Sequence, residues 1–266
     1  MRRQLNSIPI TGIARTITDL AGICAPENAA ASIDIICNCA KEFFGSKKID
    51  RVFMYNPDAI AMWLFQKHTA LFEKTLISSD IQLPMLSVMP TVTPVCFASM
   101  YTGTMPDLHG IKAYEKPVLK ADTIFDAYIR AGLKPAIVST VNDSISCIFL
   151  ERNMDYYICY THEECNTKAL ELIEEDNHDL IVLYNGNYDA AMHRTGPESF
   201  EAMNELKECI EMYRLLIEHI KLHWSAHRTF TGFCTDHGCH EIDRSLGSHG
   251  LEMAEDLNVV HFFRFI

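Results

Sequence analysis

Six residues able to bind a metal ion occur in four separate short segments of the 266-residue chain. They are Asp58, Asp189, His193, Asp236, His237 and His249. Carboxylate oxygens and imidazole nitrogens bind zinc and similar divalent ions. Asp189 and His193 are four residues apart, so on a helix or in a tight loop both side chains can face one ion. These residue types and spacings indicate metal-dependent chemistry.

Thr93 is the candidate nucleophile, in the segment Pro90-Thr-Val-Thr93-Pro. A free hydroxyl is a weak nucleophile, and coordination to a metal ion lowers its pKa enough for attack. Thr93 suits a helix N-cap, Pro94 suits the first helical position and Gly103 suits the C-terminal stop, which predicts a short helix over 93–103. Its N-terminus would favour a phosphate anion.

Each of these residues also has a purely structural explanation when it is considered alone. Asp58 and Thr93 could simply cap the helices that follow them. An Asp-His-Gly sequence is good turn chemistry, and His249 between glycines could be an ordinary loop residue. The acidic runs 171–176 and 198–211 are most simply explained as solvated helix faces.

The elements that must position these residues alternate between short apolar strands and longer amphipathic helices. Strands are predicted over 51–55, 136–139, 145–150, 155–160, 179–184, 229–234 and 259–265, and helices over 59–76, 122–132, 163–175 and 198–223. This pattern predicts a three-layer α/β/α sandwich with a mostly parallel central sheet. Asp58, Asp189 and Asp236 each follow a predicted strand closely, so they are expected together at the carboxyl edge of the sheet.

The length of 266 residues suits one α/β domain, or at most two small ones, and we expect a single domain over 1–266. Residues 1–48 are expected to be an N-terminal extension of two helices, the second starting near Pro26. A net charge of −12 argues against binding a nucleic-acid polymer. Ten cysteines without a CxxC pair suggest reduced thiols in the cytoplasm. Neither a signal peptide nor a membrane span is expected.

The order of the motifs resembles the type I phosphodiesterase/nucleotide pyrophosphatase family of the alkaline phosphatase superfamily. Residues 90–103, followed by Pro106 and His109-Gly-Ile111, are similar to the family's nucleophile motif. Residues 189–197 are similar to its D-x-x-G-H-x-x-G-P, with Met192 in place of the glycine. Residues 236–238 resemble its D-H-G, and residues 249–250 its closing H-G. The resemblance covers about residues 50–266.

This resemblance implies two divalent metal ions, usually zinc and sometimes manganese. Asp189, His193 and His249 would hold one ion. Asp58, Asp236, His237 and the Thr93 oxygen would hold the other. The implied reaction is hydrolysis of a small phosphate ester, first of all a phosphodiester, through a phosphothreonine at Thr93.

The substrate contacts are less defined by the motifs. The family often has an asparagine shortly after His-Gly-Ile, and here Lys112-Ala-Tyr114 follows. Lys112, Tyr114 and His240 are candidate substrate-binding residues, whereas His109 is expected to be structural. The chain is short for a nucleotide-cleaving member, so nucleotide specificity is not carried over.

Other reactions on the same scaffold stay open. A phosphomonoesterase or a phosphonate hydrolase would use the same site, and a non-catalytic metal-binding protein is a third possibility. A sulfatase would have a modified Cys or Ser where Thr93 stands, and a mutase would need an added cap domain.

Overall fold

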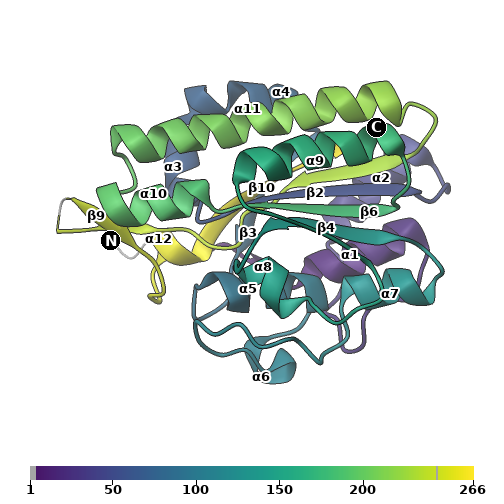
Figure 1. The fold of residues 1–266 in the computed structure, drawn as a ribbon, viewed down its shortest axis with the longest axis horizontal. Helices are drawn as coiled ribbons and strands as arrows, with labels where there is room; N and C mark the ends of the chain where they lie inside the picture. Colours follow the sequence, from purple (N-terminus) through teal and green to yellow (C-terminus); the bar gives the residue numbers. More distant parts are fainter. Residues whose placement is uncertain (1–3, 244) are drawn as a thin grey trace.

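The computed structural model describes residues 4–243 and 245–266, and its centre is an eight-stranded sheet (Figure 1). In spatial order the strands are β1 (Ile8–Pro9), β3 (Ile81–Leu86), β10 (Asn258–Phe265), β7 (Thr229–Phe233), β2 (Arg51–Pro57), β6 (Leu180–Asn185), β4 (Pro135–Thr140) and β5 (Asp155–Cys159). β10 runs antiparallel to both of its neighbours, and the other pairings are parallel. The sheet is therefore mostly parallel, as the sequence predicts.

Helices cover both faces of this sheet (Figure 1). One face packs against α3 (Met62–Lys67), α9 (His162–Glu175), α10 (Asn187–Thr195) and α11 (Phe200–His223). The other face packs against α1 (Gly12–Ala21), α2 (Asp34–Phe44), α5 (Thr93–Thr102), α7 (Ile124–Arg130) and α8 (Ser144–Ile148). The predicted three-layer α/β/α sandwich is confirmed.

The central strand β6 shows why the chain forms two cores. Leu180 and Val182 belong to the core under α1 and α5, whereas Ile181 and Leu183 belong to the core under α9 and α11. All four side chains are fully buried. Successive strand residues point to opposite faces, so a strand covered on both sides is a continuous apolar run.

Three predicted elements differ from the structure. Most of the predicted strand 145–150 lies in helix α8, because the Asp143 carboxylate caps its first turn by accepting from the Ser146 N–H at 2.6 Å. The predicted helix 59–76 is divided into α3, the short 3₁₀ turn η1 (Thr69–Phe72) and α4 (Glu73–Ile77).

The second N-terminal helix begins at Asp34, not near Pro26. The preceding segment is held in an extended path by two hydrogen bonds: Ala30 N–H donates to Gly103 O at 2.8 Å, and Ile33 N–H donates to Thr16 Oγ1 at 2.8 Å. Within the described ranges, no helix is both long and apolar enough to cross a membrane.

Candidate active site

The six metal-binding candidates converge at the carboxyl edge of the sheet. Asp58 directly follows β2, Asp189 lies on α10 just after β6, and Asp236 comes three residues after β7. His249 follows β9 (Leu246–Ser248), which forms a hairpin with β8 (His240–Ile242). Since β7, β2 and β6 are adjacent parallel strands, their carboxyl ends bring these distant segments together.

Asp189, His193 and His249 form the first group. The Asp189 Oδ1 atom lies 3.3 Å from His193 Nε2 and 3.4 Å from His249 Nε2, and the two imidazole nitrogens are 3.0 Å apart. The three ligand atoms thus surround one small volume, as a single metal ion requires.

Asp58, Asp236 and His237 form the second group, and they are almost completely buried. His237 Nε2 lies 3.2 Å from Asp236 Oδ2 and 3.5 Å from Asp58 Oδ1. The rings of His237 and His249 stack at a centroid distance of 4.1 Å, so the two groups share a wall.

Thr93 completes the second group. Its Oγ1 lies 3.2 Å from Asp58 Oδ2 and 3.4 Å from His237 Nε2. Thr93 is the first residue of α5, whose N-cap is Val92, one residue earlier than the sequence predicts. Because α5 starts at Thr93, the positive end of its dipole faces the hydroxyl and favours an anion there.

Backbone carbonyls orient all three imidazoles. Nδ1 of His193 lies 3.0 Å from Gly247 O, Nδ1 of His249 lies 2.7 Å from Thr91 O, and Nδ1 of His237 lies 3.0 Å from Gly238 O. A carbonyl can only accept, so each Nδ1 carries a proton and each Nε2 is turned toward the carboxylates. This is how metal-binding histidines are held in proteins.

One oxygen of each of the three carboxylates has no hydrogen-bond partner. Asp58 Oδ1, Asp189 Oδ1 and Asp236 Oδ2 are buried and make no hydrogen bond. A buried, unsatisfied carboxylate oxygen is costly, and burial of a charge usually requires a partner charge or a metal ion. Three such oxygens facing three oriented Nε2 atoms fit two divalent cations.

The pKa values of the acids also indicate that this site favours a bound cation. Burial, and secondarily the charge of Asp189, raises the pKa of Asp58 to about 7. Burial and the nearby Asp58 raise the pKa of Asp236 as well. Burial also acts to raise the pKa of Asp189, but the adjacent imidazoles of His193 and His249 outweigh this and lower it. Two of the three acids therefore resist ionisation until a cation is close.

Two glycines are required by close approaches. A Cβ on Gly238 would lie 2.1 Å from Glu255 O, so the turn after His237 accepts no side chain. A Cβ on Gly247 would lie 2.2 Å from Met192 Sδ. Met192, which departs from the family motif, thus packs into the space left by Gly247.

The predicted substrate-binding residues have other partners. Lys112 Nζ lies 2.7 Å from Asp107 Oδ1, and exposed Tyr114 lies under Lys116 Nζ, 5.4 Å from the ring centroid. His240 Nδ1 lies 2.7 Å from the buried Asp256 carboxylate. Their role in substrate binding stays a prediction.

His109 is a structural residue in its contacts. The ring is buried between α5 and α6 (Pro106–His109). His109 Nδ1 accepts from the Ile111 N–H at 3.2 Å, so Nε2 carries the proton and donates to Ser99 Oγ at 2.9 Å. Burial lowers the pKa of His109 to about 4, which keeps the ring neutral.

Tyr184 belongs to the site but carries no motif signal. Its hydroxyl donates to Asp58 Oδ2 at 2.5 Å, and the side chain is buried. In the sequence Tyr184 is only one apolar position of a strand. Its contact depends on the pairing of Asn56 with Tyr184 between β2 and β6, which sequence spacing does not reveal.

Comparisons with known proteins show the family of the chain. The sequence model of the type I phosphodiesterase / nucleotide pyrophosphatase family matches residues 56–260, which contain the six metal-binding candidates and Thr93. A search of curated proteins finds no match.

Solved structures share the fold. Murine ectonucleotide pyrophosphatase / phosphodiesterase 5 matches with a TM-score of 0.59 and 18% identity, over 73% of this chain and 58% of that one. The human protein gives the same values. An inactive threonine-to-alanine variant of the murine protein, in complex with AMP, has the same TM-score and identity, over 73% of this chain and 59% of that one. The chain therefore spans less than two thirds of the length of these structures.

Proposed function

The chain belongs to the type I phosphodiesterase / nucleotide pyrophosphatase family, and from this premise we propose that it hydrolyses small phosphodiesters with Thr93 as the nucleophile. The observation that carries the proposal is the position of Thr93 Oγ1, which lies 3.2 Å from Asp58 and 3.4 Å from His237 at the start of α5. A threonine that only capped a helix would not need unsatisfied carboxylate oxygens beside it.

Two divalent cations, zinc in the first instance and manganese as the alternative, complete the proposed site. Asp189, His193 and His249 would hold one, and Asp58, Asp236, His237 and the Thr93 oxygen would hold the other. When bound, such ions supply Lewis-acid stabilisation of the attacking and leaving oxygens.

The side chains around Thr93 have defined tasks in this proposal. The Thr93 hydroxyl proton points toward Asp58 Oδ2, which can accept it as Oγ1 attacks phosphorus. The Tyr184 hydroxyl donates to the same Oδ2 and fixes the orientation of the Asp58 carboxylate. The bond to the leaving oxygen breaks, a phosphothreonine forms, and water then cleaves it and restores the hydroxyl.

The substrate is proposed to be a small ester rather than a polymer. The related variant structure contains AMP, which supports a nucleotide-type phosphoryl group. The net charge of −12 disfavours binding an extended polyanion.

The remaining proposals concern the chain as a whole. We take residues 1–266 as one catalytic domain, because β1 pairs with β3 in the main sheet and α1 packs on α5. All ten cysteines are free thiols, which supports action in a reducing compartment such as the cytoplasm.

The test is hydrolysis of a nitrophenyl phosphodiester beside the matching monoester, with zinc or manganese added, for wild type and Thr93→Ala. The proposal expects diester cleavage that is lost in the variant. Cleavage of the monoester alone, also lost in the variant, would change the function to phosphatase. Equal cleavage by metal-free and metal-loaded protein would overturn the metal-dependent mechanism.

A further inference from the structure

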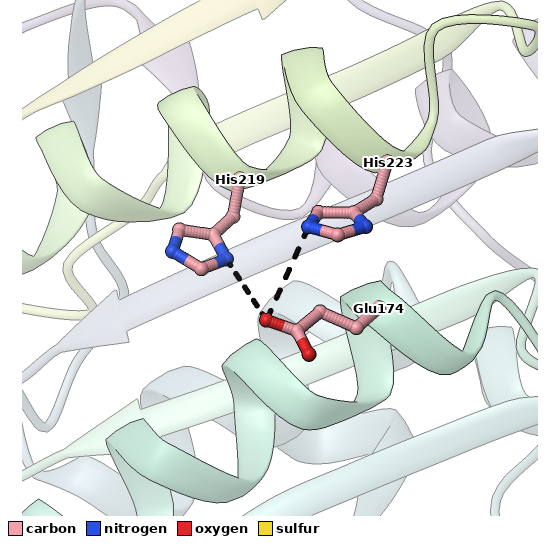
Figure 2. Close-up of side chains that lie close together, drawn as sticks. All are labelled: Glu174, His219 and His223. Atoms are coloured by element: carbon pink, nitrogen blue, oxygen red, sulfur yellow. Dashed lines mark ion pairs between the residues drawn. The ribbon is translucent and has the colours of Figure 1, made fainter.

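A separate cluster of possible metal ligands lies on the helical layer formed by α9 and α11, away from the two groups around Thr93. Figure 2 shows Glu174 of α9 pointing toward His219 and His223 of α11. The Glu174 Oε1 atom lies 3.7 Å from His219 Nδ1 and 4.0 Å from His223 Nε2. One carboxylate oxygen and two imidazole nitrogens thus converge within 4.8 Å of one another.

This group is separate from the site around Thr93. Glu174 lies near the end of α9, six residues before β6 begins, whereas Asp189 follows the end of β6. The six residues of β6 span about 20 Å. The two groups therefore lie at opposite ends of this strand.

The three atoms converge without bonding to one another directly. Both distances to Glu174 exceed the range of a hydrogen bond. His219 Nδ1 is buried and has no hydrogen-bond partner. A tetrahedral zinc ion with bonds of about 2.0 Å separates its ligand atoms by about 3.3 Å, so small side-chain rotations would close the triangle around an ion.

The backbone around the group is already fixed. Trp224, the residue after His223, is fully buried, and its indole N–H donates to Ile173 O, next to Glu174, at 2.9 Å. This bond sets the spacing of α9 and α11 beside the three ligands. The four-residue spacing of His219 and His223 places both imidazoles on one face of α11, where their rings lie 5.8 Å apart.

We propose that Glu174, His219 and His223 bind a zinc-class transition-metal ion that links α9 to α11, in addition to any ions at Thr93. Two imidazoles and one carboxylate are a ligand set that zinc, nickel and copper accept, with the fourth position left to water. The side chains are 29–52% exposed, so an ion reaches them from solvent. The ion cross-links the two helices and raises the stability of the protein.

The test counts ions bound per chain by equilibrium dialysis of the full chain against zinc, followed by elemental analysis. The His219→Gln/His223→Gln variant is expected to bind one ion fewer than wild type, with at least about a tenfold loss in affinity for that ion. The Glu174→Gln variant, which keeps both histidines, is expected to weaken the same ion. The matched control is His68→Gln, because His68 contacts a single carboxylate, Glu198, at 2.6 Å.

The readout does not depend on the proposed enzymatic activity. Zinc stoichiometry and affinity equal to wild type in both His219→Gln/His223→Gln and Glu174→Gln would overturn the proposal and leave an ordinary His–Glu ion pair. An equal loss in His68→Gln would also overturn it, since nonspecific surface histidines would then explain the binding.

Discussion

The two groups of metal-binding side chains use similar residues in opposite surroundings. Around Thr93 the acids are largely buried and each imidazole is oriented by a backbone carbonyl. On α9 and α11 the side chains are partly exposed, and within the described ranges neither His219 nor His223 makes a hydrogen bond to the backbone. The backbone carbonyls that orient the imidazoles therefore distinguish the preorganised site around Thr93 from the surface cluster, whose side chains must rotate to bind an ion.

The difference also has an energetic side. The buried group holds three carboxylate oxygens without partners, at a cost to the metal-free fold. The surface group contains one carboxylate, which water can solvate. The comparison predicts that substitutions around Thr93 change catalysis and stability strongly. Substitutions of Glu174, His219 or His223 are predicted to leave catalysis unchanged.

The largest effect is expected for Thr93→Ala. Loss of the nucleophilic oxygen is expected to lower kcat/KM for the phosphodiester by at least about 10³-fold, while the zinc content falls by less than one ion per chain. Thr93→Ser, which keeps a hydroxyl, is the matched control and is expected to retain part of the activity. Full activity in Thr93→Ala would remove the distinction between the two groups.

Asp58→Asn tests how much the buried carboxylate destabilises the metal-free fold. Burial raises the pKa of Asp58 from 3.8 to about 7 in the metal-free fold, so the ionised group destabilises that fold as pH rises above 3.8, up to about 7. Metal-free Asp58→Asn is therefore expected to be more stable than metal-free wild type at pH 8 by about 4 kcal/mol, and nearly equal to it near pH 4.

With zinc bound, the order of stability is expected to reverse, because the Asp58 variant lacks an anionic ligand. Chelator and zinc titrations followed by thermal unfolding measure both states. A metal-free variant less stable than wild type at pH 8 would contradict the view that this carboxylate is kept for binding a cation.

Tyr184→Phe is expected to have an intermediate effect. The variant removes only the hydroxyl that donates to Asp58 Oδ2, so kcat/KM is expected to fall about tenfold. Tyr213→Phe is the control, because Tyr213 is equally buried but its hydroxyl contacts Thr231 on β7. Equal effects in the two variants would mean that Tyr184 acts only through packing.

The smallest effect on chemistry is expected for His219→Gln/His223→Gln. Its kcat/KM for the phosphodiester is expected to stay within about twofold of wild type, because surface substitutions away from a site rarely change its geometry. Steady-state kinetics with both sites supplied with zinc is the measurement. A tenfold loss would mean that the two ends of β6 are coupled.

The sequence predicts that the three acids around Thr93 meet, because each of them follows a strand closely. Asp58, Asp189 and Asp236 come after three strands that prove to be adjacent, so their meeting follows from the fold class. The helix starting at Thr93 is likewise predicted by local signals, Pro94 in its first turn and Gly103 at its C-terminal end, although its N-cap is Val92 and not Thr93.

Contacts that depend on tertiary packing cannot be predicted from local sequence signals. Tyr184 reaches Asp58 only through strand pairing, and Glu174 meets His219 from a helix 45 positions earlier. Glu174 lies in an acidic run that the sequence explains as a solvated helix face. Residues 145–150 were wrongly predicted as a strand, because their apolar pattern does not show the Asp143 cap.

The most direct test of Thr93 as nucleophile is the stereochemistry of hydrolysis at phosphorus. A phosphorothioate diester that is chiral at phosphorus would be hydrolysed in isotopically labelled water, and the configuration of the product determined. Attack by Thr93 followed by attack of water requires two in-line displacements, so the account predicts net retention of configuration. Net inversion would show a single direct attack by water and would contradict the central claim.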